Sequence, residues 1–238
     1  MKATNLGLLY HIQNIYYNYL IDILYGSCRH LSSSCRFEKG IITAHMQLTQ
    51  MGDRVVIVGG GDGRTAIAAA KQVGRNGSVT IFEGGDRSYM QIENLLASRG
   101  LSSTCSVHHA VVGPLIDVYG GDYEEALLLS PADLPECDIL ELDCEGSEIE
   151  ILRHLCIHPR VIIVEIHPFL LPEEPGWVLN RLVELGYRIV CRSGHNGIEI
   201  DHEDCEQLLS RSRTYGGIML KNGATTPVIV AAVLDQER

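Results

Sequence analysis

Acidic and histidine side chains follow two predicted strands in the second half of the chain, and their chemistry suits proton transfer. Asp143 ends the strand expected at residues 138–143 and Glu145 follows it, and His167 ends the strand expected at residues 161–167. Carboxylates and imidazole can accept the proton that a hydroxyl group loses when it reacts, and imidazole titrates near neutral pH. Asp143, Glu145 and His167 are therefore the candidate catalytic residues, provided that the fold brings the two strand ends together.

A glycine-rich loop supplies a second group of candidates. The apolar run Val55–Val58 breaks into Gly59–Gly63, and an alanine-rich helix is expected from residue 64 to residue 73. Glycine lets the backbone turn tightly and lets a ligand approach it, while a helix N-terminus offers free N–H groups. Glu83 lies near the spacing expected for a ribose-binding carboxylate. The alternative for Glu83 is a solvated acid at a strand end.

The loop alone fits two kinds of nucleotide cofactor. Gly61-x-Gly63-x-x-Ala66 satisfies a dinucleotide pattern, whereas Gly59-x-Gly61-x-Gly63 is common in binders of S-adenosylmethionine. Asp62 inside the loop would repel a pyrophosphate. The loop therefore favours S-adenosylmethionine, with an NAD-dependent oxidoreductase as the alternative.

Strands and helices alternate along the chain, which is typical of a mostly parallel sheet with helices on both faces. We expect seven strands, at residues 55–58, 78–83, 104–109, 138–143, 161–167, 187–191 and 228–234. Helices are expected at residues 6–25, 40–50, 64–73, 86–98, 147–155 and 175–185, a helical turn at 123–129 and a short additional strand at 115–119.

The predicted fold class is α/β, a doubly wound, mostly parallel seven-stranded sheet with an N-terminal helical extension. Residues 1–50 form the extension and residues 51–238 the cofactor-binding domain in this prediction. Right-handed crossovers bring the carboxyl ends of the parallel strands to one rim, where ligands bind. The glycine loop, Glu83, Asp143 and His167 all lie at that rim.

Residues 138–148, Asp-Ile-Leu-Glu-Leu-Asp-Cys-Glu-Gly-Ser-Glu, resemble the D-x-x-K-x-D-x-E-G-x-E signature of FkbM-type methyltransferases. Glu141 stands where that family usually has lysine, so the role of that lysine does not carry over. Residues 56–65 and 164–167 resemble the family's cofactor loop and its next strand. The matching positions of the signature are Asp138, Asp143, Glu145, Gly146 and Glu148.

The resemblance implies a class I methyltransferase that uses S-adenosylmethionine, releases S-adenosylhomocysteine and methylates a hydroxyl of a small or sugar-like acceptor. Ala110 and Val111 are assigned to the adenine by position in the class. The implied cofactor-binding residues are Gly59, Gly60, Gly61, Asp62, Gly63, Thr65, Glu83, Gly84, Ala110, Val111, Asp143 and Cys144.

Each site residue also has a plainer explanation. Asp143 and Glu145 could stabilise the N-terminus of the helix after them, and His167 could be held by a backbone contact. Asp143, Glu165 and His167 could ligate a divalent cation. Mg²⁺ is compatible with the resemblance but not required, so no metal site is predicted. Cys144 is expected to be a buried thiol rather than a nucleophile.

Composition limits the partners. The 238-residue chain carries a net charge of -11, which disfavours nonspecific binding to nucleic acid or to an anionic membrane. We expect no membrane span, no secretory signal, reduced cysteines and a cytoplasmic location. N-terminal tyrosines are compatible with a homodimer. A binding subunit without catalytic activity is the non-enzymatic alternative, and residues 192–223 receive no assigned role.

Overall fold

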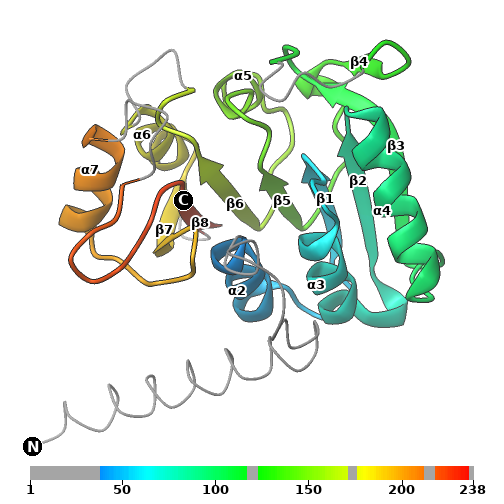
Figure 1. Cartoon of the computed structure of the whole chain (residues 1–238), viewed down its shortest axis with the longest axis horizontal. Coiled ribbons are helices and arrows are strands. Elements are labelled where there is room, and N and C mark those ends of the chain that lie inside the picture. Colours follow the sequence, from blue (N-terminus) through cyan, green and yellow to red (C-terminus); the bar gives the residue numbers. More distant parts are fainter. Residues whose placement is uncertain (1–37, 117–122, 171–175, 212–217, 236–238) are drawn as a thin grey trace, which may run out of the picture. The chain divides into compact units, whose positions relative to one another are not determined.

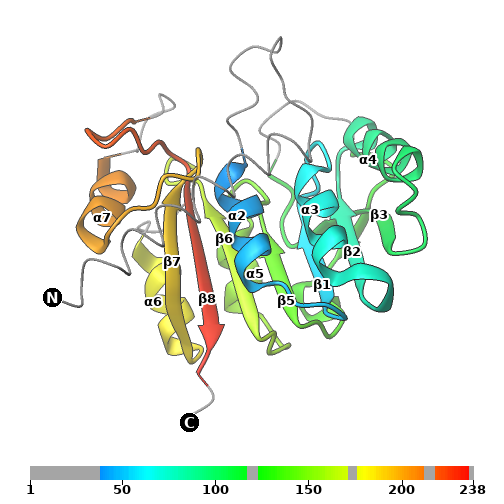
Figure 2. The same ribbon diagram turned by 90° about the horizontal axis from the view of Figure 1, so that it is seen from below.

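Eight strands form one sheet in the computed structural model, which describes residues 38–116, 123–170, 176–211 and 218–235 (Figures 1 and 2). The order across the sheet is β4-β3-β2-β1-β5-β6-β8-β7. The strands are β1 (Arg54–Val58), β2 (Ser78–Glu83), β3 (Cys105–Val112), β4 (Leu127–Leu129), β5 (Ile139–Leu142), β6 (Val161–Ile166), β7 (Tyr187–Gly194) and β8 (Val228–Leu234).

The sheet is mostly parallel, which confirms the predicted α/β fold class. β1 pairs in parallel with both β2 and β5, and β5 pairs in parallel with β6. Only β8 runs against its neighbours, β6 and β7, among the strands of the described residues. The sheet has one strand more than predicted. The addition is β4, an edge strand in the region where the sequence predicted a helical turn.

Helices cover both faces of the sheet, and alternate strand residues decide which helices they meet. Val56, Leu140 and Val164 share one hydrophobic cluster with residues of α5, α6 and α7. Because side chains alternate along a strand, the residues between them face α2 and α3 instead. The helices are α2 (Lys39–Leu48), α3 (Arg64–Val73), α4 (Asp86–Ser98), α5 (Glu148–Arg153), α6 (Gly176–Glu184) and α7 (His202–Arg211), with 3₁₀ turns at Gly74–Asn76 and Pro131–Asp133.

Two expectations for helices have different outcomes. The helix expected at residues 40–50 is present as α2, whereas the helix expected at residues 6–25 lies outside the described residues. α7 was not predicted and lies within the stretch 192–223 that received no role. None of the helices in the described ranges is long and apolar enough to cross a membrane.

Helix α2 packs closely on the sheet through a glycine. A Cβ added to Gly40 would lie 2.7 Å from Ser193 Oγ and 2.9 Å from Ile229 Cγ1, so a larger residue would push the helix off β7 and β8. Residues 38 and beyond group into one structural unit with the sheet. A domain boundary at residue 50 therefore stays a prediction.

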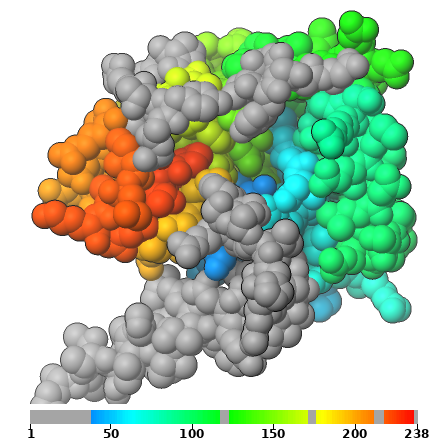
Figure 3. All heavy atoms as spheres, viewed as in Figure 1, coloured from blue at the N-terminus to red at the C-terminus, as the bar shows by residue number. Residues whose placement is uncertain are grey.

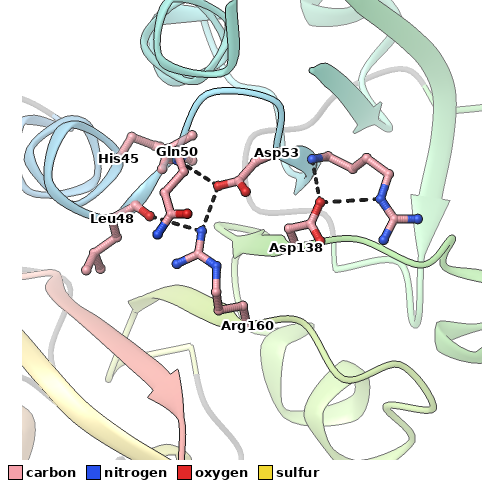
Figure 4. Close-up of polar contacts among 8 residues, drawn as sticks. His45, Leu48, Gln50, Asp53, Asp138 and Arg160 are labelled. Atoms are coloured by element: carbon pink, nitrogen blue, oxygen red, sulfur yellow. Dashed lines mark hydrogen bonds and ion pairs between the residues drawn. The ribbon is translucent and has the colours of Figure 1, made fainter. Parts of the chain in front are cut away.

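Polar contacts hold the amino ends of the central strands (Figure 4). Asp138 Oδ2 accepts hydrogen bonds from the backbone N–H of Arg54 at 2.8 Å and from its Nε at 3.3 Å. Asp53 Oδ2 accepts from Gln50 N and from Arg160 Nη2, both at 2.7 Å. Asp138, the first aspartate of the signature, thus joins β5 to β1 at the amino ends of the strands, and the catalytic candidates lie at the opposite, carboxyl ends.

Candidate active site

A cavity of about 720 Å³ lies at the carboxyl ends of the central strands. The chain runs outward from β1 through β2, β3 and β4 on one side, and through β5 and β6 on the other. The two sides can be followed by colour in Figure 3, with β2, β3 and α4 in cyan to green and α7 in orange. Ligands of open α/β sheets bind where the strand order reverses in this way.

Most predicted cofactor residues line this cavity. They are Gly59, Gly61, Glu83, Gly84, Ala110, Val111, Asp143 and Cys144, and the catalytic candidate Glu145 lines it too. Gly60, Asp62, Gly63, Thr65 and the catalytic candidate His167 are absent from the described lining. The cavity therefore brings together the glycine loop, the end of β2 and the signature loop.

Glycine is required where β1 ends because the neighbouring strand is close. Gly59 has φ +92°, and a Cβ there would lie 1.7 Å from the backbone oxygen of Asp143. No side chain fits that gap, so the glycine lets the ends of β1 and β5 approach each other.

Glu83 organises the loop from the end of β2. Its Oε2 accepts hydrogen bonds from the N–H groups of Gly60 at 2.9 Å and Gly61 at 3.1 Å. Its Oε1 accepts from Gly85 N at 2.8 Å. Each carboxylate oxygen has two lone pairs, so Glu83 can hold the loop and still accept from a ligand hydroxyl in the cavity.

Asp62 and Thr65 are absent from the cavity lining and make contacts within the start of α3. Asp62 Oδ1 accepts from the backbone N–H of Arg64 at 3.1 Å, and Asp62 Oδ2 lies 2.6 Å from Arg64 Nε. The first contact gives the backbone N–H at the start of α3 an acceptor, and the second pairs the carboxylate with a positive charge. Thr65 is buried in the first turn of the same helix.

The signature loop after β5 is held by its last glutamate. Buried Glu148 reaches back, and its two oxygens accept from Cys144 N at 2.9 Å and Gly146 N at 2.7 Å. The loop turns through positive φ at Glu145 (+55°) and Gly146 (+106°). A non-glycine residue in this region is strained, and such strain clusters at functional sites. Asp143 and Glu145 thus reach the cavity on a loop that Glu148 fixes.

An acidic and histidine cluster lies behind the cavity wall. His167 Nε2 is 3.4 Å from Glu145 Oε2 and 3.5 Å from Glu165 Oε1, and His195 Nε2 is 3.8 Å from that same Glu165 oxygen. Burial, followed by the charge of Glu165, raises the pKa of Asp143 well above its usual range. Burial and the charges of Glu38 and Glu145 do the same for the pKa of Glu165.

Burial has opposite consequences for the imidazole and the thiol of this region. It lowers the pKa of His167 to about 4, so the ring is neutral at physiological pH and a weak base. It raises the pKa of Cys144 well above its usual value, which keeps the thiol protonated. A thiol in this state is a poor nucleophile. The predicted burial of Cys144 is only partial, because the residue is half-buried and lines the cavity.

Several site residues were missed by sequence reasoning because helix α2 delivers them from far along the chain. Glu38, at the start of α2, lines the cavity, and burial together with the charge of Asp62 raises its pKa to about 7. His45 Nε2 lies 2.5 Å from Glu141 Oε2, and both side chains are fully buried. Glu141, which replaces the family's lysine, is therefore the partner of a helix histidine. The unusual residue at position 141 was the only sequence signal for this pair.

Comparison with known proteins supports one family over part of the chain. The model described as "Methyltransferase FkbM domain" matches residues 122–189, a stretch that contains β5, the signature loop and β6. The predicted resemblance is confirmed for this segment. This segment supports the predicted S-adenosylmethionine-dependent methyltransferase, and the match begins after the glycine loop. A search of curated proteins found no matching sequence.

Solved structures that are similar in fold include two methyltransferases. A SAM-dependent O-methyltransferase of Thermotoga maritima is 19% identical, with 91% of this chain and 71% of that chain covered and a TM-score of 0.50. A protein of Pyrococcus horikoshii described as a candidate RNA methyltransferase is 12% identical, with coverages of 83% and 81% and a TM-score of 0.50. At these identities the likeness concerns the fold, and it leaves the acceptor undecided.

Proposed function

We propose that the chain is an S-adenosylmethionine-dependent methyltransferase that acts on a hydroxyl group of a small, sugar-like acceptor. The observation that carries the proposal is the arrangement of one cavity between two kinds of wall. The glycine loop and Glu83 form the wall suited to the nucleoside, and the carboxylates of Asp143 and Glu145 lie at the signature loop. Carboxylates can both orient a hydroxyl and accept its proton.

The residues present fit S-adenosylmethionine, which when bound supplies an electrophilic methyl group on a positively charged sulfur. Glu83 would accept from the ribose hydroxyls, and the apolar Phe82, Ala110 and Val111 line the same cavity for the adenine. Glu38 lies over the loop, since its Oε1 is 3.5 Å from the position of a Cβ on Gly61. We assign Glu38 to the ammonium group of the cofactor's amino-acid part.

Glu145 is the residue that best suits proton removal from the acceptor. It lines the cavity, and its side chain is 22% exposed. Its backbone has a positive φ, which is a strained conformation for a residue other than glycine. Asp143 would orient the hydroxyl beside it. His167 lies behind Glu145 with a pKa of about 4, so its predicted catalytic role becomes, in this proposal, the positioning of the Glu145 carboxylate.

The charge of the protein argues for a neutral acceptor. The net charge is -11, and the acceptor end of the cavity is itself acidic, so phosphate-bearing acceptors such as RNA would be repelled. A polyhydroxyl compound carries no such penalty. The cysteines of the described residues are all free thiols, which fits a reducing compartment such as the cytoplasm. A homodimer stays a prediction.

A methylation assay tests the proposal. The full chain would be incubated with methyl-labelled S-adenosylmethionine and a panel of neutral sugars and short polyols, with RNA as the competing acceptor class. We expect label transfer to a hydroxyl compound, and about 100-fold lower turnover in Glu145→Gln, since a positioned base contributes about 10²–10⁴ in rate. Glu93→Gln, on the outer surface of α4, is the matched control. Transfer to RNA alone would contradict the proposal.

A further inference from the structure

Three side chains from neighbouring strands converge at the cavity wall, one lining it and two behind it. Asp143 follows β5, while Glu165 lies in β6 and His167 directly follows it. Each of the three residues has one nitrogen or oxygen atom within 4.8 Å of such an atom of the other two. Because Leu142 and Val164 are paired in register, the next residues of the two strands lie side by side.

Two of these groups, Glu165 and His167, are buried without the partners that buried polar atoms normally have. Glu165 is 2% exposed and its Oε2 lacks a hydrogen-bond partner, and His167 is 5% exposed with Nδ1 in the same condition. The contacts from His167 and His195 to Glu165 Oε1, at 3.5 Å and 3.8 Å, are too long for hydrogen bonds. The described ion pairs bring no lysine or arginine to Asp143 or Glu165.

A cation would satisfy this arrangement. Buried charges in proteins are paired or coordinate metals. The buried carboxylate of Glu165 and the half-buried carboxylate of Asp143 form, with the imidazole, a mixed oxygen and nitrogen donor set. Mg²⁺ and Ca²⁺ prefer oxygen donors, whereas imidazole suits first-row transition ions. We propose that Asp143, Glu165 and His167 bind one divalent transition-metal ion of the Mn²⁺ type.

The spacing is compatible with such a site once the side chains close around the ion. Ligand atoms at about 2.0–2.2 Å from an ion lie about 4.0–4.4 Å apart when they are opposite each other and about 3 Å apart when they are at right angles. Because three ligands cannot all be opposite each other, atoms within 4.8 Å of one another must approach by roughly 1–2 Å when the ion binds. Glu145 Oε2, 3.4 Å from His167 Nε2, lies beside the proposed ion.

The ion would lie where it could bind the acceptor hydroxyl, and this role rests on the proposed function. Of the three ligands only Asp143 lines the cavity, so the ion would sit in the wall at the acceptor end. A metal ion there acts as a Lewis acid and makes a hydroxyl bound to it easier to deprotonate. Glu145 would then receive the proton.

Direct metal binding tests the proposal independently of methyl transfer. The chelator-treated full chain would be titrated with MnCl₂, with free Mn²⁺ followed by electron paramagnetic resonance. We expect one ion per chain and a higher melting temperature with Mn²⁺. Glu165→Gln should weaken Mn²⁺ binding by about tenfold or more, since even outer-shell changes cost 10–100-fold. Glu150→Gln, on the exposed side of α5, removes the same charge outside the cluster and should bind Mn²⁺ normally.

The outcomes separate this site from the proposed function. Absence of saturable Mn²⁺ binding up to about 1 mM, an affinity of about -4 kcal/mol, would overturn the metal site. So would wild-type affinity in Glu165→Gln. If that variant does not fold, Asp143→Asn replaces it under the same criterion. Mn²⁺ binding in a chain that transfers no methyl group to hydroxyl compounds would overturn the proposed function and leave the metal site standing.

Discussion

Glu148 holds the backbone of Gly146 through a hydrogen bond of 2.7 Å between the Gly146 N–H and Glu148 Oε2. The second oxygen of the same buried carboxylate holds Cys144 N at 2.9 Å. The last glutamate of the signature therefore shapes the loop that carries Asp143 and Glu145 toward the cavity. Its role is structural, although it belongs to the motif that resembles the signature of FkbM-type methyltransferases.

Glu148→Gln tests this role. The amide can accept through only one of its two heavy atoms, so one backbone N–H of the buried loop loses its partner. We expect the free energy of unfolding to fall by about 1–3 kcal/mol, measured by urea denaturation at pH 8. Glu150→Gln on the exposed side of α5 should change it by less than about 0.5 kcal/mol. Equal stability of Glu148→Gln and wild type would contradict the structural role.

Two glycines of the cofactor loop should respond differently to alanine. Gly59→Ala places a Cβ 1.7 Å from Asp143 O, so we expect a severe loss of stability or no folded protein. In Gly61→Ala the new Cβ has open space, and its nearest neighbour is Glu38 Oε1 at 3.5 Å. We expect the free energy of unfolding to fall by about 1–2 kcal/mol, because alanine is disfavoured at the positive φ of this position. Thermal unfolding of both variants measures the contrast. A Gly61→Ala protein less stable than Gly59→Ala would show that the loop is arranged differently.

The pKa of Glu38 predicts a pH dependence of cofactor-product binding. In the ligand-free protein, burial and the charge of Asp62 raise the pKa of this carboxyl to about 7, with Glu141 adding to the rise and Arg64 opposing it. Pairing with the ammonium group of S-adenosylhomocysteine needs the ionised carboxylate. Affinity should therefore rise about tenfold from pH 6 to pH 8, as measured by isothermal titration.

Two controls isolate Glu38 in that measurement. 5′-Methylthioadenosine lacks the amino-acid part, so its affinity should change little over the same pH range. Glu38→Gln should weaken the binding of S-adenosylhomocysteine, flatten its pH dependence and leave 5′-methylthioadenosine unaffected. A variant that weakens both compounds equally would show that Glu38 does not contact the ammonium group.

The buried pair of His45 and Glu141 should be coupled in stability. Their Nε2 and Oε2 atoms lie 2.5 Å apart, and His45 Nδ1 is also hydrogen-bonded to Thr49 Oγ1 at 2.9 Å. Removing one partner leaves a buried polar group, and we expect His45→Ala or Glu141→Ala to cost about 3–5 kcal/mol each. The double variant should cost less than the sum of the two. Additive losses in the denaturation experiment would mean that the pair is not coupled.

Local patterns were sufficient to predict the centre of the sheet. The apolar runs at β1, β2 and β6 lie between glycines, acids and prolines, and these signals depend on neighbouring residues only. β4 was missed because its three leucines lie in a stretch that predicted a helical turn and show no polar–apolar alternation. Leu127 and Leu128 are 66% and 73% exposed at the sheet edge. Here the pairing with β3, and not burial, defines the strand.

The site was predictable as far as strand ends could place its residues. Asp143, Glu145 and Glu83 reach the cavity because parallel strands end together. Glu38 and His45 approach the site through the packing of α2, and sequence spacing carries no information on that approach. Asp138 and Glu148 were recognised as members of a motif, but only their hydrogen bonds distinguish them from the residues that face the cavity.

Isothermal titration of the full chain with S-adenosylhomocysteine tests the central claim most directly. The arrangement of Glu83 and the glycine loop predicts one binding site per chain with micromolar affinity, about -8 kcal/mol. Glu83→Gln should weaken it by about 1.5–3 kcal/mol, because charge-assisted hydrogen bonds to the ribose and the loop are lost. Glu93→Gln should bind as the wild type does. A folded sample that binds no S-adenosylhomocysteine at high micromolar concentration would contradict the account.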